Sequence, residues 1–337
     1  GARFQYLAAS TVDTATGRTL LPAYHVKRFE GIPVAFIGLT LKDTPKIVVP
    51  SGVAGLAFRD EAETVNALVP ELRARGAKIP LGTWVMSASP IVAEAIGHAG
   101  FHWGVLDMEH TPMDMMEVIH LLQAVGNTKM VPVVRVPWND TVTVKRVLDA
   151  GATTLLFPFV QNADEAARAV ASTRYPPEGI RGMAGMSRAT KFGTVPDYAK
   201  NANKGMGVIV QLETPAAVAQ LEAIAAVPGV DAIFLGPGDL SASMGHVGAM
   251  THPEVMSVMG NAAERCKALG KPVGTVGGTP ELVVQYRAMG YDFVAIGSDL
   301  GLLMRGAQAA VKSLTTAEGD TVVHTLAGGT QTPSGAY

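Results

Sequence analysis

From about residue 80 onward, short apolar runs alternate with segments whose apolar residues recur at helical spacing. The apolar runs are LGTWVM (81–86), HWGVLDM (102–108), VPVVRV (131–136), TTLLFP (153–158), GVIVQL (207–212), AIFLGP (232–237), PVGTV (272–276) and DFVAIG (292–297). Runs of this length without polar alternation are typical of strands in a parallel sheet that is buried on both faces. The intervening segments, such as PIVAEAIGHAG, MDMMEVIHLLQAVG and NADEAARAVASTR, read as amphipathic helices. The pattern therefore predicts eight consecutive strand–helix units.

Eight such units within residues 79–315 match the usual size of a (β/α)8 TIM barrel, an α/β fold. A doubly wound open sheet is the competing architecture, but no G-x-G-x-x-G sequence follows the first strand. We therefore expect the barrel to span residues 77–316.

The two ends of the chain break this rhythm. In residues 1–76, FQYLAAS and KRFEGIPVAFIGLT read as strands, the second broken by Gly31-Ile32-Pro33, and RDEAETVNALVPELRARG reads as a helix ending at Gly76. This part is predicted to be a small α+β extension without catalytic function. Residues 317–337 are rich in Gly, Thr and Ser, which predicts a flexible tail.

The composition limits the class of partner. Of the 337 residues, 48% are hydrophobic and 17% are charged, which describes a compact soluble protein. A net charge of -2 without a long basic run gives no electrostatic reason to expect nucleic acid or an anionic membrane as a partner. The single cysteine, Cys266, lies in a helix-like stretch and permits neither an internal disulfide nor a thiolate metal site. The absence of a long apolar stretch or signal-like layout favours the cytoplasm and a small-molecule ligand.

Two carboxylates lie close to the ends of consecutive predicted strands. Glu213 closes GVIVQLE, and Asp239 follows AIFLGPGD. Two such oxygen ligands facing one cavity suit Mg²⁺ or Mn²⁺. The alternative is that both are helix N-caps, since helical stretches begin at Thr214 and Leu240.

A TIM barrel carries its chemistry at the carboxyl ends of its strands, where further polar residues are predicted here. Those at the remaining strand ends are Asp107, Glu109, His110, Arg135, Gln211 and the turn Gly236-Pro237-Gly238. A metal held by Glu213 and Asp239 can chelate a 2-oxo acid and polarise its carbonyl, so that an adjacent carbanion becomes an enolate. Main-chain N–H groups of the glycine turn could bind the carboxylate. His110 could move a proton with Asp107 holding its tautomer, and Arg135 could meet negative charge on an oxygen.

These residues occur in strings that resemble the HpcH/HpaI family of metal-dependent (class II) pyruvate aldolases over about residues 77–315. The strings are LGTWVMS, VLDMEHTP, PVVRVPWND, VLDAGATTLLFPFVQNADEA, RYPPEGIRG, VIVQLET and IFLGPGDLSASMG. The resemblance implies that Glu213 and Asp239 bind a divalent metal ion (Mg²⁺, Mn²⁺ or Co²⁺) and that Gln211 and the Gly238 main chain contact the oxo acid. It further implies that His110 transfers the proton and that Arg135 stabilises the charge on the aldol oxygen.

Three further expectations come with this resemblance. Asp149 matches an acidic residue that supports the histidine of a neighbouring subunit, which implies a homo-oligomer, commonly a hexamer built as a dimer of trimers. Met108 stands where many relatives have Gly, and the loop carrying Ser187 and Arg188 is about one residue shorter than in dicarboxylate-cleaving relatives, so both bear on the choice of aldehyde. Trp84 is expected to contribute to the same acceptor pocket.

Residues 1–75 are similar to an internal piece of the 5'-nucleotidase metallophosphoesterase family. They lack that family's Asp/His/Asn metal motifs, and Ser10 stands where relatives commonly carry Asn. The expected activity therefore resides in the barrel. It is the reversible cleavage of a 4-hydroxy-2-oxo acid, such as 4-hydroxy-2-oxoheptanedioate in aromatic catabolism or a 2-keto-3-deoxy sugar acid, to pyruvate and an aldehyde through a metal-bound enolate. The alternatives are an acyl-CoA lyase of the citramalyl- or malyl-CoA type and a non-catalytic oxo-acid binding protein.

Overall fold

The computed structural model describes residues 6–29, 32–74 and 80–318. The chain divides into two compact units, Gly1–Ile79 and Pro80–Tyr337. Each unit has its own sheets, and each is described here by itself.

The first unit contains two small antiparallel sheets and one helix. Strands β1 (Thr11–Asp13) and β4 (Leu56–Phe58) form one pair, and β2 (Tyr24–Phe29) and β3 (Ile32–Ile37) form the other. Two 3-10 turns, η1 (Thr44–Lys46) and η2 (Pro50–Val53), precede β4, and α1 (Glu61–Ala74) follows it. The described part of this unit thus combines strands with a helix, but two details of the prediction are wrong. No strand forms over residues 6–10, and KRFEGIPVAFIGLT is not one broken strand but parts of the two strands of a hairpin. The predicted helix end at Gly76 lies outside the described residues.

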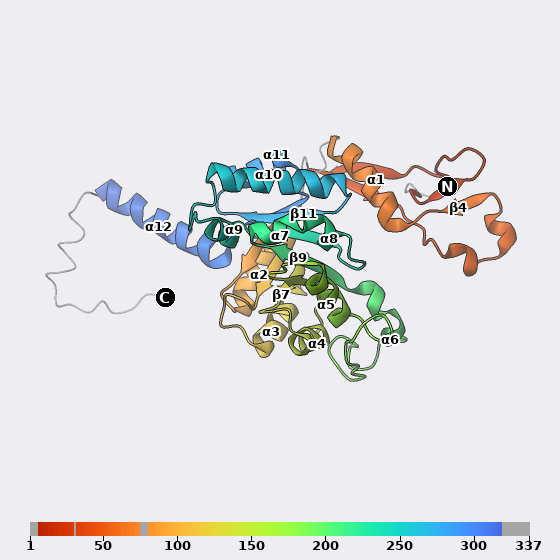
Figure 1. Ribbon diagram of the computed structural model, residues 1–337, viewed down its shortest axis with the longest axis horizontal. Coiled ribbons are helices and arrows are strands. Elements are labelled where there is room, and N and C mark those ends of the chain that lie inside the picture. Colours follow the sequence, from red (N-terminus) through yellow and green to blue (C-terminus); the bar gives the residue numbers. More distant parts are fainter. Residues whose placement is uncertain (1–5, 30–31, 75–79, 319–337) are drawn as a thin grey trace. The chain divides into compact units, whose positions relative to one another are not determined.

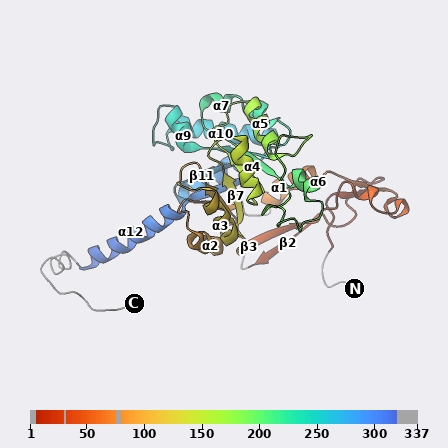
Figure 2. The same cartoon turned by 90° about the horizontal axis from the view of Figure 1, so that it is seen from below.

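The second unit is a closed barrel of eight parallel strands in the order β10-β11-β12-β5-β6-β7-β8-β9 (Figures 1 and 2). The strands are β5 (Leu81–Val85), β6 (Trp103–Asp107), β7 (Val131–Arg135), β8 (Thr154–Phe157), β9 (Gly207–Leu212), β10 (Ala232–Leu235), β11 (Val273–Gly277) and β12 (Phe293–Ser298). All eight coincide with the predicted apolar runs within a residue or two at each end. The predicted TIM barrel is therefore confirmed.

Helices follow the strands and cover the outside of the barrel (Figures 1 and 2). They are α2 (Pro90–His98), α3 (Met115–Val125), α4 (Thr141–Asp149), α5 (Ala163–Thr173), α6 (Tyr198–Asn201), α7 (Pro215–Ala219), α8 (Leu221–Ala225), α9 (Pro237–Ser243), α10 (Pro253–Ala268), α11 (Pro280–Met289) and α12 (Asp299–Glu318), with a 3-10 turn η3 (Ala202–Gly205). Ser, Asp, Asn or Thr side chains cap several of them, and Pro is often the first helical residue, which is why the chain turns into helix at these points. Helix α12 reaches Glu318, so the first two residues of the predicted tail are helical.

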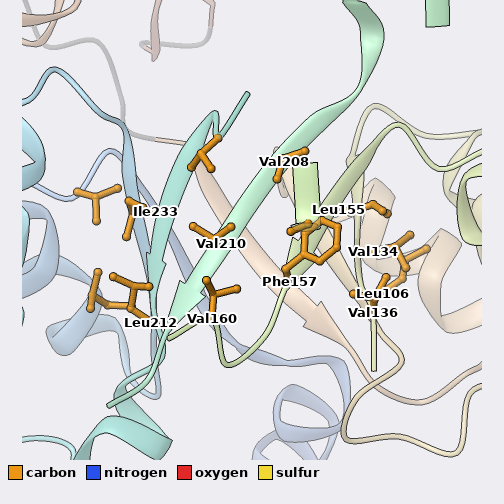
Figure 3. Close-up of a cluster of buried hydrophobic side chains, with 14 of the residues drawn as sticks. Leu106, Val134, Val136, Leu155, Phe157, Val160, Val208, Val210, Leu212 and Ile233 are labelled. Carbon is orange, nitrogen blue, oxygen red and sulfur yellow. The ribbon is translucent and has the colours of Figure 1, made fainter. Parts of the chain in front are cut away.

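Successive side chains along each strand point to opposite faces of the sheet and pack in two different hydrophobic clusters. The larger cluster joins strand residues such as Leu106, Val134 and Val210 to helix residues such as Leu121 and Leu221, and it fills the space between the sheet and its helices. Figure 3 shows part of this cluster, with Val208, Val210 and Leu212 following one another on the same face of β9. Buried Cys266, on α10, belongs to the same cluster and so packs this helix against the barrel.

The smaller cluster contains strand residues and no helix residue, so it fills the barrel interior. Its buried members are Trp84, Trp103, Val105, Val133, Leu156, Phe234 and Ala295. A Cβ atom at Gly82 would lie 2.2 Å from the Trp103 ring, so the glycine makes room for the indole. Large rings therefore close the barrel below the carboxyl ends of its strands, where the site lies.

Candidate active site

The polar residues predicted at the carboxyl ends of the strands lie together. Asp107 and Arg135 are the last residues of the neighbouring strands β6 and β7 and are paired in register. Glu213 follows β9 directly, and Asp239 lies in the first turn of α9, just after β10. Glu213 is influenced electrostatically by both Glu109 and Asp239, which places these carboxylates in one charged group.

Arg135 is the central cation of this group. Its Nε and Nη2 donate to the two oxygens of Asp107 at 2.8 and 2.7 Å, and its Nη1 lies 2.9 Å from Oε2 of Glu109. Its Cζ also lies 5.6 Å from the centre of the Trp84 ring. Burial lowers the pKa of Arg135. The hydrogen bonds that Arg135 donates to Asp107 and the attraction of the nearby carboxylates outweigh this effect, so the pKa is raised. The guanidinium is therefore held charged in a fixed orientation.

This pairing changes the role expected for Asp107. The fully buried Asp107 carboxylate binds Arg135, and its contact with His110 is to the backbone N–H, at 3.5 Å. The expectation that Asp107 holds the imidazole tautomer is therefore not what this structure shows. The nearest carboxylate to the His110 ring is Glu109, whose Oε2 lies 3.8 Å from Nε2. The imidazole itself is 55% exposed and can reach solvent or a ligand.

Glu213 is fixed from two sides. Its Oε2 accepts a bond from the backbone N–H of Phe159 at 2.8 Å, and its Oε1 accepts one from Nε2 of Gln211 at 2.7 Å. Phe159 has a φ of +55°, a left-handed conformation that is unusual for a bulky residue and that sets the direction of its N–H. Burial raises the pKa of Glu213 well above its usual range, and the charges of Glu109 and Asp239 add to this effect.

The turn after β10 makes room for this carboxylate. A Cβ atom at Gly236 would lie 2.5 Å from Oε1 of Glu213 and 2.8 Å from Nε2 of Gln211, so only glycine fits there. Pro237 opens α9 and is buried, whereas Gly238 has open space where a side chain would be. The N-caps of the two helices are Thr214 and Gly236, so neither Glu213 nor Asp239 is an N-cap. The alternative interpretation of both acids as N-caps is therefore wrong.

Glu109 was named among the polar residues predicted at the strand ends, but it was assigned no role from the sequence. Burial raises its pKa to about 7, against the attraction of Arg135 and with the repulsion of Asp107 and Asp239. Only its distance to Arg135 and His110 reveals its importance, and no spacing rule gives that distance. Phe159 was missed, because its contribution is a backbone N–H.

Asp149 lies at the end of α4, away from these strand ends in the sequence. Its Oδ1 accepts a bond at 2.9 Å from Nη2 of the fully buried Arg181. Within one chain it therefore forms a structural ion pair. Its predicted role in a neighbouring subunit remains a prediction.

The charge balance of the site favours a cation. Four carboxylates, those of Asp107, Glu109, Glu213 and Asp239, influence one another electrostatically, and the guanidinium of Arg135 contacts two of them, Asp107 and Glu109. In addition, Oε1 of Gln211 is buried and has no hydrogen-bond partner in the described part of the chain. A buried oxygen without a partner next to carboxylates with raised pKa values suits a hard divalent cation. The residues present therefore fit such an ion.

Comparisons with known proteins agree with this geometry. The family model of the HpcH/HpaI aldolase/citrate lyase family matches residues 81–306. The chain belongs to this family. It is 49% identical over 235 residues to a 2-dehydro-3,6-dideoxy-6-sulfogluconate aldolase of Pseudomonas putida, which covers 70% of this chain and 92% of that protein. It is 47% identical over 246 residues to a 5-keto-4-deoxy-D-glucarate aldolase of Salmonella arizonae, with 72% and 96% covered.

A solved structure shows the same family fold. The crystal structure of an HpcH/HpaI aldolase/citrate lyase family protein from Burkholderia cenocepacia superposes with a TM-score of 0.69 at 41% identity, covering 73% of this chain and 98% of that one. The expected class of enzyme, a carbon–carbon lyase of the aldolase type, is thus confirmed. The family match begins at residue 81, so the resemblance of residues 1–75 to a 5'-nucleotidase remains a prediction. Within the described residues, no helix has both the length and the apolar character needed to cross a bilayer.

Proposed function

We propose that the chain is a class II pyruvate aldolase that reversibly cleaves a 4-hydroxy-2-oxo acid to pyruvate, or a close 2-oxo acid, and an aldehyde. The observation that carries the proposal is the group of four mutually interacting carboxylates at the carboxyl ends of the strands, two of which contact Arg135. Glu213 and Asp239 would hold a divalent cation, either Mg²⁺, Mn²⁺ or Co²⁺. When bound, such an ion supplies Lewis-acid polarisation of the substrate carbonyl.

The residues around the cation have distinct tasks in this proposal. The N–H of Phe159 and the amide of Gln211 hold Glu213 with its oxygens already oriented, so the site needs little rearrangement to bind. The open space at Gly238 lets the oxo-acid carboxylate approach its main-chain N–H. Arg135, locked by Asp107, meets the negative charge that develops on the 4-oxygen. His110, exposed at the edge of the site, takes the proton of the 4-hydroxyl in the cleavage direction, directly or through water.

The substrate class follows from the relatives. Both named relatives act on acidic keto-deoxy sugar derivatives, and they match this chain at 49% and 47% identity. We infer that this chain also takes a 2-keto-3-deoxy sugar acid in preference to an acyl-CoA ester. Trp84 is 6% exposed and lies under Arg135, so it would shape the floor of the site rather than the acceptor entrance.

We also propose a homo-oligomer, with a hexamer as the expected form. Helix α12 projects away from the rest of the barrel unit (Figure 1) and exposes five large apolar side chains. They are Leu300, Leu303, Met304, Val311 and Leu314, at 43%, 64%, 55%, 62% and 65%. A second chain that covers this helix would bury them. Asp149 could then complete a neighbour's site. Mass photometry of the full chain tests this, since a monomer would exclude that role for Asp149.

The test of the activity is removal of the cation. Protein treated with EDTA is expected to lose pyruvate release from a keto-deoxy sugar acid and to regain it with Mg²⁺, Mn²⁺ or Co²⁺. Glu213→Ala is expected to fail to regain it because the ion no longer binds. Full activity after rigorous metal removal would exclude the proposed mechanism. The cytoplasmic location and a non-catalytic role for residues 1–76 remain predictions.

A further inference from the structure

A second group of metal-ligating side chains lies in the loop between α9 and α10 and in the first turn of α10. It consists of His246, His252 and Glu254, and one nitrogen or oxygen atom from each lies within 4.8 Å of those of the other two. The imidazole rings of the two histidines are stacked, with centroids 3.6 Å apart and planes 18° apart. Nε2 of His246 lies 2.8 Å from Oε2 of Glu254. None of these residues belongs to the aldolase site.

The loop that carries these side chains is folded by its own backbone. The N–H of His246 donates to Ser241 O at 2.8 Å, the N–H of Ala249 to His246 O at 2.9 Å, and the N–H of His252 to Ala249 O at 2.9 Å. Gly245 and Gly248 adopt φ values of +83° and +75°, which permit the two tight turns. The two imidazoles are therefore brought together by fixed backbone turns rather than by chance rotation of long side chains.

We propose that His246, His252 and Glu254 form a second cation site that takes a borderline transition metal such as Zn²⁺, Co²⁺ or Ni²⁺. Two imidazoles with one carboxylate are a common ligand set for such ions, whereas Mg²⁺ prefers oxygen ligands alone. Water would fill the remaining position, since three protein ligands leave a tetrahedral site open. The site would tie the α9–α10 loop to the first turn of α10.

The distances require only small movements. In a tetrahedral site with bonds near 2.1 Å, ligand atoms lie about 3.4 Å apart. The Glu254 side chain is 69% exposed and the His246 side chain 23%, so both can adjust without disturbing the core. The cation would replace the proton between His246 and Glu254. Coordination at His252 would also replace the long 3.3 Å bond that its Nδ1 accepts from the N–H of Glu254, and this N–H is at an exposed position where water can bind it.

The ordinary alternative is an ion pair between His246 and Glu254 next to a helix cap. This pairing lowers the pKa of Glu254 through its hydrogen bond with His246. It leaves the second imidazole without a part in the pairing, since the His252 ring accepts only the long bond from the N–H of Glu254. A divalent cation uses both rings in their neutral form.

The experiment is a Zn²⁺ titration of the metal-free full chain in excess Mg²⁺, which occupies the carboxylate site, with a chromophoric chelator as competitor. We expect one Zn²⁺ site in the parent and at least about tenfold weaker binding in His246→Gln and His252→Asn. Asn keeps a capping oxygen at position 252, and the N-cap is untouched in His246→Gln, so these variants should fold. His98→Gln, at an exposed histidine in the last turn of α2, is the matched control and should bind Zn²⁺ as the parent does.

Two further readouts separate this site from the aldolase site. Co²⁺ bound to nitrogen ligands in four-coordinate geometry should give strong visible absorption that His246→Gln loses. Pyruvate release in Mg²⁺ should be the same in the parent, His246→Gln and His252→Asn. Zn²⁺ affinity in His246→Gln equal to that of the parent, or a loss in His98→Gln as large as in His246→Gln, would overturn the proposal while leaving the aldolase proposal untouched.

Discussion

Polar side chains have different roles at the amino ends and at the carboxyl ends of the barrel strands. At the amino end, a residue immediately before a strand accepts a bond from a backbone N–H of the neighbouring strand. His102 Nδ1 accepts from Leu81 at 3.1 Å, Asp231 Oδ2 from Val208 at 2.7 Å, and Asp292 Oδ2 from Val273 at 2.9 Å. At the carboxyl end, four carboxylates influence one another electrostatically, and two of them contact Arg135. The amino end thus uses polar residues to complete the sheet, whereas the carboxyl end keeps charge available for a cation and a substrate.

The largest effect should come from neutralising Glu213, the buried carboxylate that is proposed to hold the cation. Glu213→Gln keeps the shape of the side chain but removes its charge, so a divalent cation should bind far more weakly. If the polarisation it supplies is worth several kcal/mol, pyruvate release should fall by about a thousandfold or more. Steady-state kinetics with metal analysis of the purified protein measures both quantities.

The matched control makes the same acid-to-amide change at the amino end. Asp231→Asn retains an oxygen that can accept the Val208 N–H bond and lies outside the site. Its turnover and metal content should equal those of the parent. If Glu213→Gln and Asp231→Asn lost turnover and metal content equally, the two ends of the strands would not differ in function.

The next effect concerns the arginine. Arg135→Ala should retain the cation, since the carboxylates remain, but lose about a hundred- to a thousandfold in turnover because the charge on the 4-oxygen is no longer met. It should also cost about 3–5 kcal/mol of unfolding free energy because Asp107, which is fully buried, loses its partner. Arg135→Lys keeps the charge but loses the two-pronged contact with Asp107. Its turnover and its unfolding free energy should lie between those of the parent and those of Arg135→Ala. An Arg135→Ala enzyme as fast as the parent would exclude the charge-stabilising role.

The barrel could be predicted from the sequence because each strand is an apolar run bounded by an amphipathic helix, and the period of the pattern changes visibly at each boundary. The hairpin of the first unit could not be placed as well. Strands β2 and β3 pair from Tyr24 with Ile37 to Phe29 with Ile32, whereas Gly31-Ile32-Pro33 in the sequence suggested a break in a single strand.

The site could be predicted only in part. A strand end is visible in a sequence, so Glu213, Asp239, Arg135 and His110 could be named. Partners could not be assigned in this way, because strand register and side-chain direction decide them. Asp107 lies opposite Arg135 in the paired strands and binds it in preference to His110, three residues further along the chain. The N–H of Phe159, whose position depends on one left-handed residue, leaves no trace in the pattern.

A smaller effect is expected from removing one capping carboxylate at the amino end. Asp231→Ala leaves the N–H of the buried Val208 without its acceptor and should reduce the unfolding free energy by about 1–2 kcal/mol. Asp231→Asn should recover most of this loss. Urea unfolding measures the difference, and unchanged pyruvate release in both variants would show that the amino end serves stability alone. If Asp231→Asn lost as much unfolding free energy as Asp231→Ala, the hydrogen-bond explanation would be contradicted.

The smallest effect should appear in the pH dependence of the metal-free protein. The pKa of Glu109 is raised from 4.5 to about 7 by burial, so the folded state binds this proton more tightly than the unfolded chain does. The resulting stability is fully present below about pH 4.5 and is lost as the pH rises through about 7. Because Glu109 is only partly buried, we expect the melting temperature to fall by only about 3 °C over this range. Glu109→Gln should reduce this slope and leave the part that is due to Glu213, and added Mg²⁺ should reduce it in the parent because the cation binds the ionised carboxylates of the folded state. A slope that is unchanged by both would contradict the raised carboxylate pKa values, and the contrast between the two ends of the barrel would then rest on the amino end alone.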